Sequence, residues 1–401
     1  VHNKWILGWI GLYIISLIDL LWIDLLPFVT YFLVQVSACF ILFSGLKSSS
    51  IPSFRSMGIR MAGVQLLLVL TLFLQVSAGN WAFMPSILEF TRGQAATMIF
   101  LAGLFLPLSS LEINLPKYEV ERPQNLKNSF RIICLMIIVI STGGIIFYEV
   151  LTPVRDPDTT HLKVMNFNIH QYFSIAQTGL YNLEQVRDVI LDSQADVVGL
   201  QESEGSRITS SNMNGVQWLV RQTGMKYYYY GPPTSAQIYG VSLLSRYPIL
   251  NPRYVDLPAE QSIERVAIVA EIETGTLAGQ LPVIVTHFQT NRYSEDRLAQ
   301  AQTIVSISEN FEKALILGDF NTRPNGTDPT FTLLNSSFSD AWIHAGNDPS
   351  EGATSYSDDG VAIHRIDYIW MKGSWTVLRC ETFGSTRTSD HRAVYAELLP
   401  N

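Results

Sequence analysis

The chain has 401 residues and a formal net charge of −8 at pH 7; 47% of its residues are hydrophobic and 15% are charged. This length is more than one domain usually needs, and three cysteines are too few for a disulfide framework. The negative net charge argues against a protein that binds the phosphates of nucleic acid, because such binding rests on a basic surface.

Charged and apolar residues are distributed unevenly along the chain. Residues 1–152 contain 9 Lys and Arg with 7 Asp and Glu, whereas residues 153–401 contain 18 and 28, a net charge of −10. The first part has the composition of a membrane region and the second that of an acidic globular domain. We therefore predict a transmembrane helical region at 1–151, a linker at 152–162 and a globular domain at 163–401.

Five apolar stretches of the first part are long enough to span a bilayer, which takes about 17 to 25 mostly apolar residues. They are Trp5–Ile23, Leu25–Leu46, Met61–Ala78, Gly93–Leu111 and Ile132–Tyr148. A signal peptide is the alternative for the first stretch, but its apolar core is long and no small-residue cleavage site follows it. Because the sequence begins at Val1, we expect that residues can precede it.

Basic residues in the loops predict the orientation of these stretches, because Lys and Arg near span ends collect on the cytoplasmic side. The loops before the third and fifth stretches are both rich in them, with Lys47, Arg55, Arg60, Lys117, Arg122, Lys127 and Arg131. With five spans, the globular domain of this multi-pass protein emerges on the extracytoplasmic side, which is a lumen, the periplasm or the cell exterior. With four spans it is cytoplasmic.

The segment TPVRDPDTTHL, residues 152–162, has two prolines and no periodicity, which is typical of a linker. Its eleven residues reach at most about 40 Å when fully extended. The globular domain is therefore expected close to the lipid surface.

From Lys163 onward, short apolar strands alternate with helical patterns. The predicted strands are rich in β-branched residues and bounded by Gly, Pro or Asn, and they are VGLQ, GVSLLS, RVAIVAEI, LPVIVTH, ALILG and IDYIW. Helices are predicted for Leu183–Asp192, after Asn182 as N-cap, and for Glu295–Asn310, after Ser294. This alternation predicts an α/β fold with stacked layers.

Polar side chains follow many of these strands, at the point where each strand ends. They are Asn168, Glu202, His287, Asp319, Asn321, Asp367, Asp390 and His391. In LGDFN, Asp319 and Asn321 are two positions apart and point to the same side of an extended chain. Burying an acid beside apolar strands is costly unless it is paired or binds a metal. Several acids in such places indicate a metal site beside a phosphate site.

Oxygen ligands of this kind suit a hard cation, most simply Mg²⁺, with Mn²⁺ or Ca²⁺ as alternatives. No Cys or His spacing suggests zinc. Hydrolysis of a phosphodiester needs an oriented water, neutralisation of the phosphoryl oxygens and help for the departing alkoxide. Asp319, Asn321, two histidines and a metal held by Glu202 and Asp390 would meet those needs.

Each short pattern taken alone has a structural alternative. Glu202 could cap a turn, and Asp367 could form an ion pair with Arg365. The order and the completeness of the whole set favour a function.

The succession NFNIH, GLQES, LLSRYPI, THF, GDFNTRP, RIDYIW and SDHRAV resembles the endonuclease/exonuclease/phosphatase superfamily, the deoxyribonuclease-like fold, across residues 161–398. The resemblance implies a four-layer α/β sandwich, in which two β-sheets pack face to face with helices outside. It places the active site at one edge of the sandwich. It also implies a metal-dependent phosphoric ester hydrolase.

The same resemblance gives roles to single residues. Asn168, Glu202 and Asp390 match the metal-site positions, and Asn168 also matches a position that touches the phosphate or supports the site. Asp319 matches the residue that orients or deprotonates the attacking water, and Asn321 helps to hold that water.

Two histidines are also implied by the resemblance. His391 matches the histidine that contacts the phosphate, with Asp367 fixing its ring through a hydrogen bond. His287 matches a second histidine, which could protonate the leaving group.

Three further residues are candidates for contact with the phosphate or the headgroup. Arg246 and Arg265 each lie beside a predicted strand, and a salt bridge is the alternative for both. His170 stands two positions after Asn168, shares its face and is expected to line the pocket.

A narrower resemblance lies between these motifs. SNMNGVQWLV, YYYYGPPTS, YGVSLLSRYPI and THFQTNRYSEDRLAQAQ resemble the soluble domain of multispan proteins that remodel the lipid of glycosylphosphatidylinositol (GPI) anchors. That domain follows transmembrane helices and faces the lumen, in agreement with the orientation predicted from charge. The chain has fewer spans than the full family, and it keeps the GDFN motif that some members lack.

The leading hypothesis is a membrane-anchored, Mg²⁺-dependent phosphodiesterase that acts on a phospholipid or GPI-type headgroup at the extracytoplasmic face. Its partners would be the lipid bilayer and a phosphorylated lipid or glycolipid, whose effective concentration a short tether raises. One alternative is an extracytoplasmic metal-dependent nuclease, which the acidic domain disfavours. The other is a non-catalytic membrane interaction module, which the intact metal and histidine set disfavours.

Overall fold

The structure is a computed structural model. It describes residues 2–18, 33–38, 41, 97, 100–101, 103–104, 156–176, 181–204, 214–231, 239–260 and 263–401. The chain divides into two compact units, one formed by Val1–Gly79 and Pro85–Leu151 and the other by Asn80–Met84 and Thr152–Asn401.

The described part of the first unit is mainly the helix α1 (His2–Ile18), which covers most of the first predicted span. It buries Tyr13 and Leu17 in a small apolar cluster with Ile41. No helix among the described residues combines the length and the apolar character that crossing a membrane requires. Met61–Ala78 and Ile132–Tyr148 lie outside the described residues, as do most of Leu25–Leu46 and Gly93–Leu111.

Two mixed six-stranded sheets form the second unit. The first has the order β13-β14-β1-β2-β4-β3, with β1 (Leu162–Asn168), β2 (Val197–Ser203), β3 (Tyr227–Gly231), β4 (Gly240–Ser245), β13 (Trp375–Phe383) and β14 (Ala393–Pro400). The second has the order β5-β6-β7-β8-β12-β9, with β5 (Ile249–Leu257), β6 (Arg265–Glu273), β7 (Gln280–His287), β8 (Ala314–Asp319), β9 (Ser339–Asp340) and β12 (Asp367–Lys372). Within each sheet one pair is parallel, β1 with β2 and β7 with β8.

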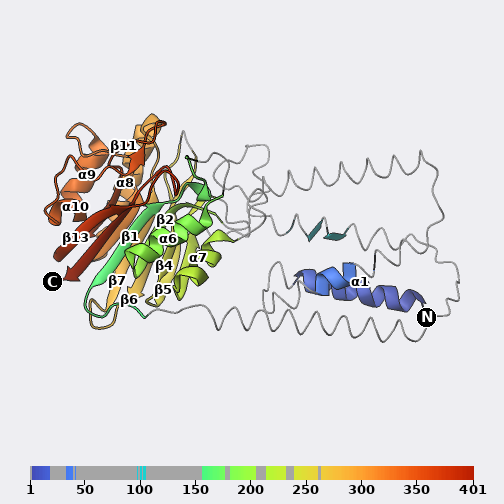
Figure 1. The fold of residues 1–401 in the computed structure, drawn as a ribbon. Coiled ribbons are helices and arrows are strands. Elements are labelled where there is room, and N and C mark those ends of the chain that lie inside the picture. Colours follow the sequence, from blue (N-terminus) through green and yellow to red (C-terminus); the bar gives the residue numbers. More distant parts are fainter. Residues whose placement is uncertain are drawn as a thin grey trace. The chain divides into compact units, whose positions relative to one another are not determined.

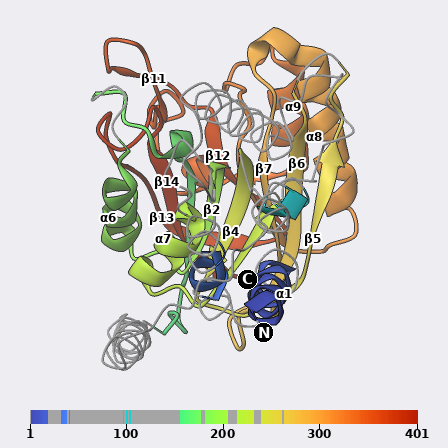
Figure 2. The same cartoon turned by 90° about the vertical axis from the view of Figure 1, so that its right-hand side faces the viewer.

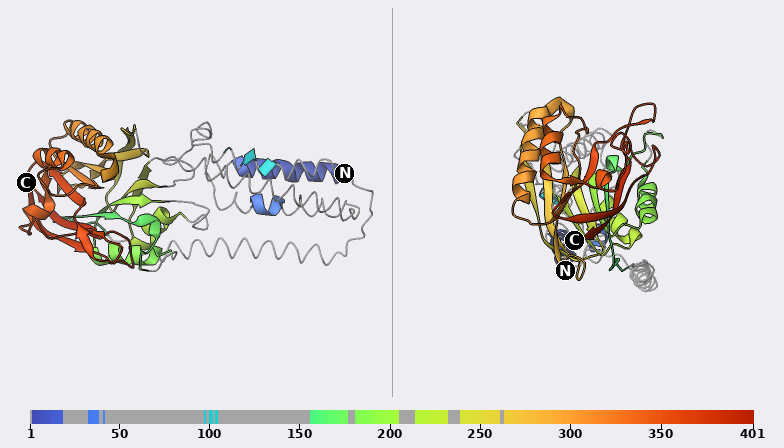
Figure 3. Two further views of the ribbon diagram at one scale, coloured as in Figure 1. Left: turned by 90° about the horizontal axis from the view of Figure 1, so that it is seen from above. Right: turned by 90° about the vertical axis from the view of Figure 1, so that its left-hand side faces the viewer.

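Helices cover the outer faces of both sheets (Figure 1). Figures 2 and 3 show α6 (Leu183–Ser193) and α7 (Gly215–Thr223) on one side, and α8 (Ser294–Ser308) and α9 (Pro329–Ser337) on the other. The short α10 (Ala341–His344) precedes a small hairpin of β10 (Ser355–Tyr356) and β11 (Ala362–His364). The predicted layered α/β sandwich is therefore confirmed for this unit.

The apolar core explains why the sequence predicts these strands. β4 and β8 are buried along their whole length, because one face packs on the other sheet and one on helices. Gly199 marks a close approach of the sheets, since a Cβ there would lie 3.0 Å from the Cβ of Leu317. Both predicted helices are present as α6 and α8.

The N-cap residue of α6 is Asn182, as predicted, but its side chain does not act as a cap, because it makes no capping hydrogen bond. Its amide nitrogen donates instead to the carbonyl oxygens of Arg387 and Thr388, 2.8 and 2.5 Å away. The side chain makes this tertiary contact instead of capping the helix, because the contact gives hydrogen-bond partners to two buried carbonyl groups of the loop before β14.

A buried polar bridge ties the two sheets together below the strand ends. The side-chain amide of Asn166 donates to the carbonyl oxygen of Gly318 in the opposite sheet, at 3.0 Å. The Asn166 oxygen accepts from the amide of Gln201 on β2, at 2.8 Å. Buried polar groups persist only when they are hydrogen-bonded, so this bridge holds β1, β2 and β8 in a fixed relation.

Candidate active site

The predicted polar side chains meet at one edge of the sandwich, because β1, β7 and β8 end there. His287 and Asp319 are opposite one another in the register of β7 and β8. Asp367 begins β12 and lies opposite Asp319 in the antiparallel pair with β8. Asn168 ends β1 in the other sheet, and its side-chain amide donates to Oδ2 of Asp319 at 3.0 Å. Four strand ends from two sheets therefore surround one carboxylate.

Asp319 is almost fully buried at the centre of this cluster. Its Oδ1 accepts the backbone amide of Asn321 at 2.9 Å, and its Oδ2 lies 3.4 Å from Nε2 of His287 and 3.8 Å from Nε2 of His391. Burial raises the pKa of Asp319, but the hydrogen bond from His287 and the influence of both histidines outweigh burial, so the pKa ends below its ordinary value. The ionised carboxylate accepts hydrogen bonds from the Asn168 side chain and the Asn321 backbone amide.

His391 is held by a second buried carboxylate. Its Nδ1 lies 2.7 Å from Oδ2 of Asp367, as the sequence resemblance implied. Burial lowers the pKa of His391, but Asp367 and Asp319 raise it well above its ordinary value. Nδ1 donates to Asp367, and Nε2 faces Asp319 at the centre of the site.

His287 has a different neighbour behind its ring. Its Nδ1 lies 2.9 Å from Nη1 of Arg265, the first residue of β6. Burial and the positive charge of Arg265 lower the pKa of His287, and Asp319 offsets this only in part. The side-chain amide of Asn321, which donates to the carbonyl oxygen of Phe288 at 3.0 Å, lies 3.4 Å from Nε2 of His287.

A bulge in β2 sets the backbone conformation at Glu202. The register of β2 with β4 shifts between Leu200 and Ser203, and Glu202 has a φ of 51°. Its carboxylate accepts from the hydroxyl of Tyr239 at 3.2 Å and from the amide of Gln171 at 3.4 Å. Burial raises the pKa of Glu202, but the nearby histidines and Arg265 hold it below its ordinary value.

Asp390 and His170 complete the open side of the cluster. Nε2 of His170 lies 3.8 Å from Oδ2 of Asp390, and both side chains are about one-third exposed, 33% and 35%. The backbone amide of His170 donates to Oδ1 of Asn168 at 3.1 Å. These contacts place His170 beside Asn168 and Asp390, two of the predicted metal-site residues.

Backbone strain is concentrated around this edge. Non-glycine residues rarely adopt a positive φ, and such strain is often stored at functional sites. Six of the eight described examples belong to the cluster, and they are His170, Gln171, Tyr172, Glu202, Tyr239 and Asn321. The surrounding hydrogen bonds hold these residues in place, which favours a preorganised site.

Arg246 does not belong to the cluster, so the prediction that it contacts the substrate is corrected. It follows β4 at the end that pairs with Val197, the opposite end of β2 from Glu202. The buried guanidinium donates to the carbonyl oxygens of Thr223 and Gly224, both at 3.1 Å, and pairs with Asp196 at 3.3 Å. The structure supports the alternative, a structural ion pair, which Arg246 forms with Asp196.

Two sets of side chains at the site have the donor atoms for a metal ion. Asp319, Asp367 and His391 offer ligand atoms within 4.8 Å of one another and could hold one. Both nitrogens of His391 face carboxylates. Glu202, Asp390 and Asn168 are the metal-site residues implied by the sequence resemblance, and they offer oxygen donors, the kind that a hard cation prefers.

Sequence reasoning missed several residues that support the site. Ser389 donates its hydroxyl to the carbonyl oxygen of Asn168 at 2.8 Å and fastens the loop of Asp390 to β1. Asn166 carries the bridge between the sheets, and its spacing of two from Asn168 could have placed both on one face. Tyr239 and Gln171 gave no signal, because their roles depend on loops that meet only in the folded chain.

The environment of His391 predicts how the protonation of its ring depends on pH. Because its native pKa is raised, the protonated ring is lost only as pH rises through that pKa. Asp367→Asn removes the carboxylate that raises it, so the pH profile of the His391 ring ¹⁵N signals should move down by about one pH unit or more. Asp192→Asn, at an exposed position of α6, should leave the profile unchanged; an unshifted profile in Asp367→Asn would contradict this assignment.

Comparison with known proteins gives three findings. A family model described as "Endonuclease/Exonuclease/phosphatase family" matches residues 165–391, more than half of the chain. A curated relative, "Protein cwh43" of Schizosaccharomyces pombe, is 30% identical over 150 residues, which are 37% of this chain and 15% of that protein. The chain therefore spans only a small part of that relative's length.

Two solved structures match parts of this chain, and the first has a similar fold. An endonuclease/exonuclease/phosphatase from Beutenbergia cavernae DSM 12333 has a TM-score of 0.52 at 21% identity, covering 60% of this chain and 72% of that one. A family protein from Leptotrichia buccalis C-1013-b has a TM-score of 0.48 at 19% identity, covering 59% and 99%. At this level of identity the similarity concerns the fold alone.

Proposed function

The chain belongs to the endonuclease/exonuclease/phosphatase family, and from this premise we propose that it is a Mg²⁺-dependent phosphodiesterase acting on a membrane-lipid headgroup. Endonucleases, exonucleases and phosphatases, which give the family its name, all hydrolyse phosphoric esters. The observation that carries the proposal is the ionised Asp319 carboxylate, buried between Asn168, the Asn321 amide and two histidines.

The residues at this edge divide the chemistry of phosphodiester hydrolysis between them. Asp319 accepts a hydrogen bond from the attacking water and aims it at phosphorus, and Asn321 restricts the position of that water. The His391 imidazolium donates from Nε2 to a phosphoryl oxygen, where negative charge grows in the transition state. Asp367 keeps the ring charged and correctly turned.

Glu202, Asp390 and Oδ1 of Asn168 are the residues that would hold Mg²⁺, or Mn²⁺ or Ca²⁺ in its place. When bound, the ion supplies positive charge to the phosphoryl oxygens and the departing alkoxide. Tyr239 and Gln171 orient the Glu202 carboxylate with hydrogen bonds to its two oxygens. Such outer contacts tune the affinity of a metal site.

Glu202→Gln should therefore raise the Mg²⁺ concentration needed for half-maximal activity by roughly 10- to 100-fold, because an amide carries no charge to attract the ion. Mg²⁺ binding by calorimetry and activation by Mg²⁺ titration would measure the change. Glu351→Gln, at an exposed loop position, is the matched control. An unchanged Mg²⁺ affinity in Glu202→Gln would remove Glu202 from the metal site.

Three features support a lipid substrate and an extracytoplasmic, membrane-anchored enzyme. The first 151 residues contain long apolar stretches, and the basic loops between them favour an extracytoplasmic domain. The segments between the motifs resemble the soluble domain of GPI-anchor lipid-remodelling proteins. The end of the linker is fastened to the domain, because Asp158 pairs with Lys163 at 2.8 Å and Asp156 with Lys226 at 2.9 Å.

The substrate class is tested with the full chain in detergent or liposomes. Vesicles containing phosphatidylinositol, sphingomyelin or a GPI-type glycolipid are incubated with Mg²⁺, and the release of water-soluble phosphate ester is measured. We expect release that Asp319→Asn abolishes. Cleavage of plasmid DNA without any lipid turnover would identify a nuclease, and Mg²⁺ binding at Glu202 without either reaction would identify a non-catalytic module.

A further inference from the structure

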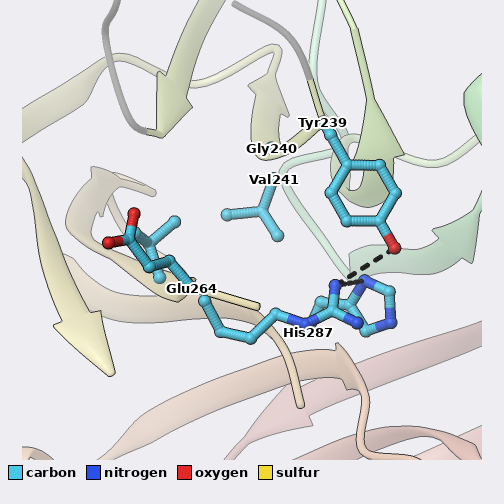
Figure 4. A pocket seen from close by; sticks show the side chains of 7 residues that line it. Tyr239, Gly240, Val241, Glu264 and His287 are labelled. Atoms are coloured by element: carbon cyan, nitrogen blue, oxygen red, sulfur yellow. Dashed lines mark hydrogen bonds between the residues drawn. The ribbon is translucent and has the colours of Figure 1, made fainter. Parts of the chain in front are cut away.

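The pocket beside His287 contains an arginine that acts on the histidine itself. Arg265 is 5% exposed, and its Nη1 lies 2.9 Å from Nδ1 of His287 and 3.3 Å from the hydroxyl of Tyr239. Its guanidinium also stacks over the Tyr239 ring, 5.3 Å from the centroid. Figure 4 shows the Tyr239 hydroxyl and the His287 ring meeting at one side of this pocket.

The contact fixes the position of the proton on His287. A guanidinium has N–H donors and no acceptor, so Nδ1 of His287 must accept and carries no hydrogen. The neutral ring therefore has its proton on Nε2. That nitrogen lies 3.4 Å from Oδ2 of Asp319, and a carboxylate can only accept. The Asn321 amide nitrogen is also 3.4 Å from Nε2, but it donates to the Phe288 carbonyl oxygen at the shorter distance of 3.0 Å. The ring therefore has a donor at Nδ1 and an acceptor at Nε2.

The pocket beside the guanidinium of Arg265 is lined by Tyr239, Glu264 and His287, among others. The polar contacts that the structure gives Arg265 are those with His287 and Tyr239, and the expectation that it binds the headgroup stays a prediction.

The two histidines of the site differ in the charged group that contacts their Nδ1 atom. His391 has the Asp367 carboxylate there, which can only accept a hydrogen bond, whereas His287 has the Arg265 guanidinium there, which can only donate one. A neutral imidazole that loses its Nε2 proton becomes an imidazolate, which is far too basic to form at neutral pH. A neutral His287 would therefore act as a hydrogen-bond donor, and the role in leaving-group protonation expected from the sequence stays a prediction.

We propose that Arg265 is a positioning residue that holds His287 as the neutral Nε2–H tautomer, so that His287 serves as a fixed hydrogen-bond donor from Nε2. The role in the reaction rests on the proposed function. The tautomer itself does not, because it follows from the contacts of the folded chain.

The test reads the tautomer directly. The full chain is labelled with ¹⁵N-histidine, and His287 is assigned as the signal that disappears in His287→Gln. At pH 7 we expect one pyrrole-type nitrogen at Nε2 and one pyridine-type nitrogen at Nδ1. An Nδ1–H tautomer or an imidazolium at His287 in the unaltered protein would overturn the proposal, whatever the substrate proves to be.

Two variants separate positioning from a general structural effect. Arg265→Met removes the donor, so the His287 signal should change to a mixture of tautomers or to the imidazolium, and kcat should fall about tenfold or more. Arg265→Lys keeps a charged donor at the same place and should keep the Nε2–H tautomer and most of the activity. Equal losses in both variants with an unchanged His287 spectrum would contradict the role of Arg265.

Discussion

Asp319→Asn is expected to lower kcat by about 1,000-fold or more, because the amide is nearly isosteric with the carboxylate but can neither carry charge nor take up a proton. In the native site the carboxylate accepts from Asn168 and from the Asn321 amide, and both histidines face it. An amide at this position would turn an N–H toward at least one of these donors. The attacking water would lose its acceptor.

The measurement is the Mg²⁺-dependent hydrolysis of a chromogenic phosphodiester at pH 7 by the full chain. Asp358→Asn, an exposed position in the β10–β11 hairpin, is the matched control and should keep full activity. Thermal unfolding of both variants shows whether the fold is intact. An Asp319→Asn protein that is folded and retains a tenth of the activity or more would rule out the proposed role of the carboxylate.

His391→Asn is expected to lower kcat by about 100- to 1,000-fold, the usual cost of removing one donor aimed at a developing negative charge. The asparagine amide can still donate toward Asp367, so the buried carboxylate keeps a partner while the Nε2 donor and the positive charge are lost. Stability should therefore fall less than in His391→Ala, where the carboxylate is left unpaired at a cost of about 3 kcal/mol or more.

Rates and urea unfolding of His391→Asn and His391→Ala would separate these effects. His344→Asn, an exposed histidine at the end of α10, provides the control for the change of residue type. Similar losses of rate in both His391 variants, with a larger loss of stability in His391→Ala, would support the role given to Nε2. A near-native rate in His391→Asn would place the phosphate elsewhere.

Much of the fold and the site was predictable because local rules act on short segments. The apolar runs that became β4, β6, β7, β8 and β12 end at Gly, Pro or polar residues, and each rule for a strand needs only a few neighbouring residues. Asp319 and Asn321 stand two apart at the end of such a run. The succession of motifs then indicated that their polar side chains meet at one edge of the sandwich, since each motif falls where a strand begins or ends.

By itself the sequence determined which side chains stand at strand ends and on which face of the chain they lie, because a strand repeats every two residues. Only the tertiary structure decided what each of them touches. Asp367 contacts Nδ1 of His391, and Arg265 contacts Nδ1 of His287. Each contact joins residues from different segments of the chain. Asn166 meets Gly318 across 152 positions of sequence. Hydrogen bonds act over about 3 Å, so a proton's position depends on a neighbour that no pattern along the chain can identify.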